Sequence, residues 1–211
     1  MAQVKELYDA ILNGNAKQAH VSTVAALAGG ADPMELISGS MVPAMDEVGK
    51  LYEAEEYFVP ELLLAGRAMK SAMELLKPLL VASGQRMATR VVIGTVKGDL
   101  HDIGKNIVAS MLEGSGFEVI DLGTDVSPEK FVSAVVEREP QFVCMSALLT
   151  VTMPAMKTTI DALANAGVRA RVKVLVGGAP VTSQYAQEIG ADGYSENASG
   201  AVSMVKNLIA A

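Results

Sequence analysis

The sequence predicts two folded parts: an all-α four-helix bundle over residues 1–85 and a Rossmann-like (flavodoxin-like) parallel α/β domain over residues 86–211. The first part carries apolar residues at helical spacing, whereas the second alternates short apolar runs with helical patterns. The runs are apolar throughout, which is typical of strands covered on both faces by helices. A chain of 211 residues is long enough to bury a core in each part.

Each helix of the bundle has a recognisable start or stop signal. Asn13-Gly14-Asn15 ends the first apolar stripe. Asp32 can cap the third helix, and Pro33 suits its first position. Gly39 and Pro43 predict an irregularity within that helix. The expected helices cover 4–12, Ala16–Leu27, about 33–55 and Pro60–Leu76, and Val81–Met87 is the expected linker.

The α/β domain is predicted to contain five strands, each followed by a helix. In such a sheet, ligands bind beyond the carboxyl ends of the strands, so the loops that follow the strands are the expected site. The strands are expected at Arg90–Val96, Phe117–Asp121, Phe142–Ser146, Lys173–Val176 and Asp192–Tyr194. The helices are expected over Gly104–Glu113, from Ser127 onward, and over Met153–Ala166, Thr182–Ile189 and Ala198–Ile209.

Composition excludes several classes of protein. The net charge of −7 argues against a nucleic-acid partner, and 4% aromatic residues without Trp argue against a base-stacking surface. A single Cys excludes a disulfide framework and a CxxC metal site. No apolar run approaches the ~20 residues of a membrane-spanning helix, and the N-terminus does not resemble a signal peptide. We therefore expect a cytoplasmic protein with no membrane partner.

The loop after the first strand contains the pattern Asp99-x-His101-x-x-Gly104. A P-loop is excluded because five residues rather than four separate Gly98 from Gly104, and Asn106 replaces the Mg²⁺-binding hydroxyl. Asp99 could bind one imidazole nitrogen of His101 and leave the other free for a metal. Gly104 is then expected to let the chain bend beside a bulky ligand. The alternative is that Asp99 and His101 only cap the next helix.

Two further motifs lie at later strand ends and carry a resemblance. Ser146-x-Leu148 ends the third strand, and Gly177-Gly178 ends the fourth. Together with the Asp99/His101 motif, at these spacings, they resemble the cobalamin-binding domain of methionine synthases, carbon-skeleton mutases and corrinoid methyl carriers. The bundle, with YFVPELLLA at residues 57–65, looks like the helical cap of that family. The resemblance covers nearly the whole chain and fits the corrinoid proteins of methylamine, methanol, glycine betaine and methoxyaromatic systems.

The resemblance implies a cobalamin in the His-on/base-off state. His101 would be the lower axial ligand of cobalt, Asp99 would bind its other nitrogen, and Thr152, preferred over Thr150, would extend the hydrogen-bond relay. The cofactor slot would also involve Gly98, Leu100, Asp102, Ile103, Gly104, Ser146, Leu148, Thr150, Gly177, Gly178, Ala179 and Tyr194. Candidates for a dry upper cover are Met41, Val42, Met45, Phe58, Val59 and Leu62, although ordinary core packing is the favoured explanation for most of them.

The implied function is that of a methyl carrier within a multi-protein system, not of a complete enzyme. A substrate-specific methyltransferase would load a methyl group onto cobalt, and a second methyltransferase would pass it to tetrahydrofolate or coenzyme M. A reductive activase would return an oxidised cofactor to its reduced state. The alternatives are a mutase cobalamin subunit, which lacks such a bundle, and a cobalamin-dependent regulator, for which the sequence shows no basic DNA-binding head.

Overall fold

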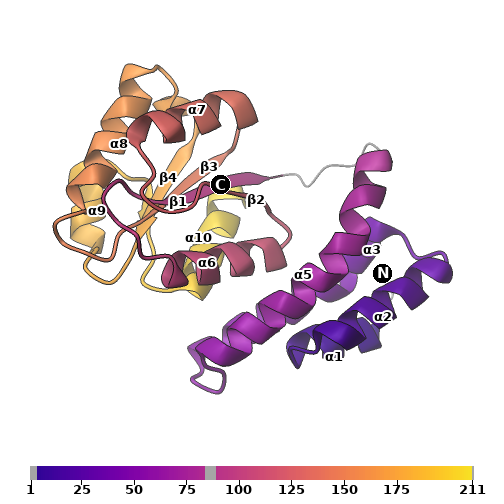
Figure 1. Cartoon of the computed structure of the whole chain (residues 1–211). Coiled ribbons are helices and arrows are strands. Elements are labelled where there is room, and N and C mark those ends of the chain that lie inside the picture. Colours follow the sequence, from indigo (N-terminus) through magenta and orange to yellow (C-terminus); the bar gives the residue numbers. More distant parts are fainter. Residues whose placement is uncertain (1–3, 84–88, 211) are drawn as a thin grey trace. The chain divides into compact units, whose positions relative to one another are not determined.

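A computed structural model of the chain describes residues 4–83 and 89–210. The chain divides into two units, residues 1–88 with 110–117, and residues 89–109 with 118–211 (Figure 1). The expected boundary at residues 85 and 86 lies outside the described residues, as do residues 84–87 of the expected linker. Among the described helices, none has the length and apolar character needed to cross a membrane.

The predicted bundle helices are present in the first unit. Asn15 caps the second helix by accepting from the Gln18 amide at 3.0 Å, and Asp32 caps the third by accepting from Met34 and Glu35. The irregularity predicted near Pro43 is a π-helical turn, in which the Val42 amide bonds to the carbonyl five residues earlier. The helices are α1 (Lys5–Leu12), α2 (Ala16–Ala28), α3 (Pro33–Leu36), the π turn (Ile37–Met41), α4 (Val42–Glu53) and α5 (Val59–Ala82).

The prediction that the last bundle helix ends at Leu76 is wrong. Helix α5 continues through Pro78 to Ala82. The apolar stripe explains the extension, because Met69, Met73, Leu76 and Leu80 are all buried at helical spacing. Proline removes one helical hydrogen bond, and here the buried stripe on both sides of it maintains the helix.

The second unit contains a five-stranded, fully parallel sheet in the order β2-β1-β3-β4-β5. Its strand and helix ends lie within about one residue of the prediction. The strands are β1 (Arg90–Thr95), β2 (Glu118–Asp121), β3 (Phe142–Ser146), β4 (Lys173–Gly177) and β5 (Gly193–Tyr194). The helices that follow the strands are α6 (Ile103–Gly114), whose residues from Ser110 onward belong to the first unit, α7 (Pro128–Arg138), α8 (Pro154–Asn165), a 3-10 turn (Arg169–Arg171), α9 (Ser183–Ile189) and α10 (Ala198–Ala210).

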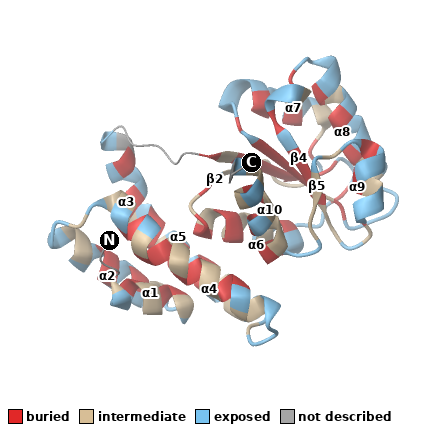
Figure 2. Cartoon of the chain, turned by 180° about the vertical axis from the view of Figure 1, so that it is seen from behind, coloured by how far each residue is buried: buried red, intermediate tan, exposed pale blue. Residues whose placement is uncertain are grey.

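The core of this unit lies against both faces of the sheet. Helices α7, α8 and α9 cover one face, and α6 and α10 cover the other (Figure 1). Figure 2 shows the central strands as buried, whereas the outward sides of α7 and α8 are exposed. Phe131, Met156 and Leu163 pack on the first face against Val92, Val143 and Val174. This rigid, buried sheet presents the loops at its carboxyl edge, where the predicted site lies.

Candidate functional site

Strand register brings the three sequence motifs together at the carboxyl edge of the sheet. Thr95 at the end of β1 pairs with Ser146 at the end of β3, and Ser146 pairs in turn with Gly177 at the end of β4. The loops that leave these three strands therefore start side by side. The chain passes from β1 to β2 in one direction and from β2 back to β3 in the other, so β1 and β3 flank the topological switch point.

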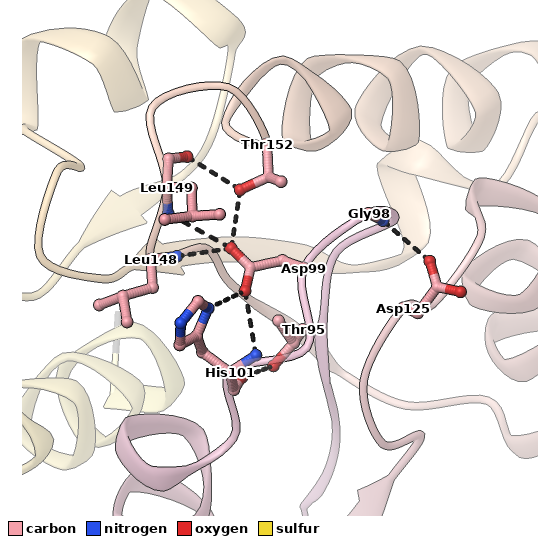
Figure 3. Close-up of polar contacts among 8 residues, drawn as sticks. All are labelled: Thr95, Gly98, Asp99, His101, Asp125, Leu148, Leu149 and Thr152. Atoms are coloured by element: carbon pink, nitrogen blue, oxygen red, sulfur yellow. Dashed lines mark hydrogen bonds and ion pairs between the residues drawn. The ribbon is translucent and has the colours of Figure 1, made fainter.

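Asp99 is the buried centre of the site. Its Oδ2 atom accepts hydrogen bonds from the amides of Leu148 at 2.8 Å and Leu149 at 3.3 Å, and from Thr152 Oγ1 at 2.7 Å (Figure 3). Its Oδ1 atom lies 3.0 Å from the His101 amide and 2.7 Å from His101 Nδ1. None of these donors belongs to α6, so the contacts of Asp99 are not those of a helix cap. They join the loop after β1 to the loop after β3.

These contacts keep the Asp99 carboxyl ionised. Burial by itself would raise its pKa, because a charge is costly away from water. The hydrogen bonds from Thr152, Leu148 and His101 outweigh burial and hold the pKa of Asp99 well below its usual range. An ionised carboxylate only accepts hydrogen bonds. Asp99 is thus a fixed negative charge at neutral pH.

The charge on Asp99 determines the tautomer of His101. Because Asp99 accepts, the Nδ1 atom of the ring carries the proton, and Nε2 of the neutral ring keeps its lone pair. Thr95 Oγ1, at the end of β1, also donates to the His101 carbonyl at 2.8 Å. The His101 side chain is 50% exposed. Nε2 of His101 is therefore the ring nitrogen that does not contact Asp99, and it can bind a ligand when the ring is neutral.

Of the two threonines considered for the relay, Thr152 contacts Asp99, whereas Thr150 is exposed. The Thr152 oxygen also lies 2.8 Å from the Leu149 carbonyl. A hydroxyl has one proton, and the ionised carboxylate is the stronger acceptor. Thr152 is thus positioned to donate to Asp99.

The same two loops and the first residue of α6 carry exposed apolar side chains. Exposure of apolar side chains to water is unfavourable. The exposed fraction is nevertheless 81% for Val151 and 74% for Leu100. A large ligand with apolar edges would cover them. The exposed apolar residues are Leu100, Ile103, Leu148, Leu149 and Val151.

Glycines after β4 allow close approach of neighbouring backbone. A Cβ atom on Gly178, whose φ is +128°, would lie 1.9 Å from the Ala147 carbonyl oxygen, and one on Gly177 would lie 3.0 Å from the Ser195 carbonyl oxygen. Only glycine fits at Gly178. The remaining residues predicted for the slot are placed as follows: Ser146 and Tyr194 are half-buried, and Ala179 and Asp102 are exposed.

The bend expected at Gly104 is not found there. Gly104 lies in the first turn of α6, and a Cβ atom on it would meet nothing within 4 Å. The left-handed residue of the loop is Gly98, with a φ of +85°. A turn of positive φ is therefore needed before His101, not after it.

The bundle residues predicted for a cofactor cover lie in the first unit and differ in exposure. Met41 and Met45 are fully buried, Val42 is half-buried, and Leu62 is buried. At the start of α5, Val59 is 37% exposed and the neighbouring Phe58 is 61% exposed. Met41, Met45 and Leu62 thus behave as core residues of their unit.

Sequence reasoning missed several contacts that hold the loop. Asp125, from the loop after β2, bonds to Gly98, and buried Lys105 pairs with Asp121. The Leu149 amide also contacts Asp99. These partners lie far apart in sequence and belong to no recognised motif. The one available signal was the charge that Lys105 carries near the start of a mostly apolar helix.

Comparison with known proteins identifies the class to which this fold and site belong. Two family profiles, each described as a B12 binding domain, match residues 89–203 and 3–77. The chain therefore belongs to the B12-binding family of corrinoid proteins, which confirms the resemblance drawn from the motifs.

Individual relatives match over almost the full length of the chain. Dimethylamine corrinoid protein 1 of Methanosarcina acetivorans is 41% identical, with 98% of this chain and 97% of that protein covered. Trimethylamine corrinoid protein 1 of the same organism is 44% identical, with 95% and 94% covered. A solved structure, the methanol:cobalamin methyltransferase complex MtaBC of Methanosarcina barkeri, matches with a TM-score of 0.88 and 31% identity. It covers 98% of this chain and 79% of that one.

Proposed function

We propose that this chain is a methyl-carrying corrinoid protein that accepts a methyl group from a substrate-specific methyltransferase. The proposal extends to a second methyltransferase, which would pass the group to tetrahydrofolate or coenzyme M, and to a reductive activase. Support comes from the family and from relatives named for dimethylamine and trimethylamine. The similarity to a methyltransferase complex supports a methyltransferase as partner.

The observation that carries the proposal is the buried Asp99 carboxylate bound to Nδ1 of half-exposed His101. We infer that Nε2 of His101 would ligate the cobalt of a bound corrinoid, in the His-on/base-off state. The negative charge of Asp99 strengthens the donor nitrogen, and the bonds from Thr152 and Leu148 prevent Asp99 from turning away.

The bound corrinoid would supply the cobalt centre that carries the methyl group. The chain's own residues would hold the corrinoid and exclude water from it. The apolar rim that includes Leu100, Leu148 and Val151 would exclude water around the imidazole. Gly177 and Gly178 would let the backbone of Ala147 and Ser195 approach β4 closely at the place where the detached nucleotide tail would bind. On the resemblance alone, we further propose that the bundle supplies an apolar cover for the cofactor.

The proposed axial ligand can be tested by labelling the protein with ¹⁵N-histidine and loading it with hydroxocobalamin. After reduction to paramagnetic cobalt(II), the electron paramagnetic resonance lines should show the doublet splitting of a ¹⁵N ligand. His101→Ala should lose this splitting and bind corrinoid at least tenfold more weakly. His20→Ala is the matched control, because His20 is exposed on α2. A labelled protein without the doublet would refute the His-on state.

The carrier role needs a second experiment. The loaded protein is reduced beyond cobalt(II) to cobalt(I), the state that can accept a methyl cation, and is mixed with a candidate methyltransferase and with a methylated amine or methanol. We expect the absorbance spectrum of a methylated corrinoid to appear with at least one of these donors. Retention of an adenosyl corrinoid together with rearrangement of a carbon skeleton would instead identify a mutase subunit.

A further inference from the structure

The loop that carries His101 is held at its first end by Asp125, from the connection between β2 and α7. Asp125 Oδ1 accepts from the Gly98 amide at 2.8 Å (Figure 3). Asp125 Oδ2 accepts from Lys97 Nζ at 3.0 Å. The Asp125 amide donates back to the Asp99 carbonyl at 2.9 Å. Side chain and main chain of one residue therefore fix the turn that precedes His101.

The same connection holds the other end of the loop through Asp121. Lys105, in the first turn of α6, is buried, and its Nζ lies 2.5 Å from Asp121 Oδ2 and 2.7 Å from Asn106 Oδ1. A buried ammonium group needs such partners, because it has lost its water. The second oxygen of Asp121 accepts from the Gly123 amide at 2.9 Å. This ion pair ties the start of α6 to the end of β2.

The connection between β2 and α7 is itself firmly bound to β1. The Leu122 amide donates to the Ile93 carbonyl at 2.8 Å, and the Thr95 amide donates to the Gly123 carbonyl at 3.0 Å. Asp125 adopts a left-handed backbone conformation, with a φ of +52°. Glycine would adopt this conformation more readily. Another residue keeps such a strained backbone conformation only where the contacts around it hold it in place. The presence of a carboxylate here is explained by its two contacts with the loop.

We propose that Asp121 and Asp125 are positioning residues that orient the imidazole of His101 before the corrinoid binds. This inference rests on the proposed function. Asp99 holds the middle of the loop from the β3 side, and Asp121 and Asp125 hold its two ends from the β2 side. Neither contacts the His101 ring, so each acts through the loop. Orientation in advance lowers the ordering cost that corrinoid binding would otherwise carry.

The first test is amide hydrogen exchange of the corrinoid-free protein with Asp125→Ala. We expect several-fold faster exchange at the His101 amide, whose own acceptor, Asp99, is unchanged. Glu139→Ala is the matched control, because Glu139 is also acidic, also has a positive φ of +47°, and pairs distantly with Arg171. This control should exchange like the wild-type protein. Asp125→Asn keeps an oxygen acceptor and should fall between wild type and Asp125→Ala.

The second test uses the ¹⁵N-histidine-labelled, corrinoid-loaded protein. Asp125→Ala and Asp121→Asn should each raise the corrinoid dissociation constant about tenfold and reduce the fraction of cobalt with the ¹⁵N doublet. Amide hydrogen exchange at His101 is also measured in Asp121→Asn. Exchange at this amide that equals the wild-type rate in both Asp125→Ala and Asp121→Asn would overturn the positioning role. A wild-type protein that binds no corrinoid would overturn the proposed function, whereas the exchange result would still decide whether Asp121 and Asp125 order the loop.

Discussion

At the scale of single residues, the site depends on five hydrogen bonds to one carboxylate. The sequence predicted Asp99, His101 and the hydroxyl of Thr152, because these residues belong to a motif or lie close to one. It could not predict Asp125 or the pairing of Lys105 with Asp121, since no local pattern indicates contacts across neighbouring strands. It also placed the tight turn at Gly104, whereas the positive φ is at Gly98. Motifs therefore predicted residues that the structure brings together at the strand ends, but not the residues that hold their loop in place.

Thr152→Val should weaken the site, because it removes one donor to Asp99 while conserving side-chain volume. A hydrogen bond to a charged group contributes about 1.5–3 kcal/mol, so we expect a loss of about 2 kcal/mol in the free energy of unfolding. Thr150→Val is the control and should change stability by less than about 0.5 kcal/mol, because Thr150 is exposed. Urea denaturation measures both. Equal losses in the two variants would contradict a role for the Thr152 contact.

Gly178→Ala should displace the loop after β3. The added Cβ atom would lie 1.9 Å from the Ala147 carbonyl oxygen, and the backbone φ is already unfavourable for alanine. Gly167→Ala separates the two effects, because Gly167 has a φ of +70° but open space around its Cβ position. We expect Gly167→Ala to cost about 1 kcal/mol and Gly178→Ala distinctly more. Corrinoid binding, followed by absorbance, should weaken only in Gly178→Ala.

At the scale of elements, local signals predicted the α/β unit better than the bundle. Its strands are short and apolar, and two of the helices between them begin at a capping side chain, Ser127 for α7 and Thr182 for α9. Helix α5 was predicted too short because Pro78 is a local stop signal, and buried Leu80 beyond it shows that tertiary packing overrides that signal. The interruption between α3 and α4 was predicted because Pro43 cannot donate a helical hydrogen bond.

Asp32→Ala should destabilise the start of α3. Its side chain accepts from the amides of Met34 and Glu35, which have no partner within the helix. Loss of a cap costs about 1 kcal/mol. Amide exchange in α3 and the following π turn measures the effect. Glu74→Ala, an exposed change within α5, should alter exchange in neither segment, and equal effects of the two substitutions would exclude a capping role for Asp32.

At the scale of the whole molecule, one buried charge joins loops from two strands, so the stability of the α/β unit should depend on pH. The pKa of Asp99 is lower in the folded protein than in the unfolded chain, where a carboxyl titrates near about 4. Its stabilising contribution is therefore fully present above that pH and is lost as the pH falls below it. A single group of this kind changes the free energy of unfolding by at most about 1.4 kcal/mol per pH unit.

Asp99→Asn provides the test, because it removes this titration while other acidic groups remain. Asp125, whose pKa the Gly98 amide and Lys97 also lower, is present in both proteins, so the difference between them isolates Asp99. Amide exchange between pH 7 and pH 3 gives the free energies of opening of β1 and β3. At neutral pH, these free energies should be much larger in the wild-type protein than in the variant. This difference in opening free energy should decrease steadily below about pH 4, because protonation then removes from the wild-type protein the carboxylate charge that the variant lacks at every pH. If the difference in opening free energy between the two proteins stayed constant across this pH range, the Asp99 carboxylate would not hold the two loops together by its charge.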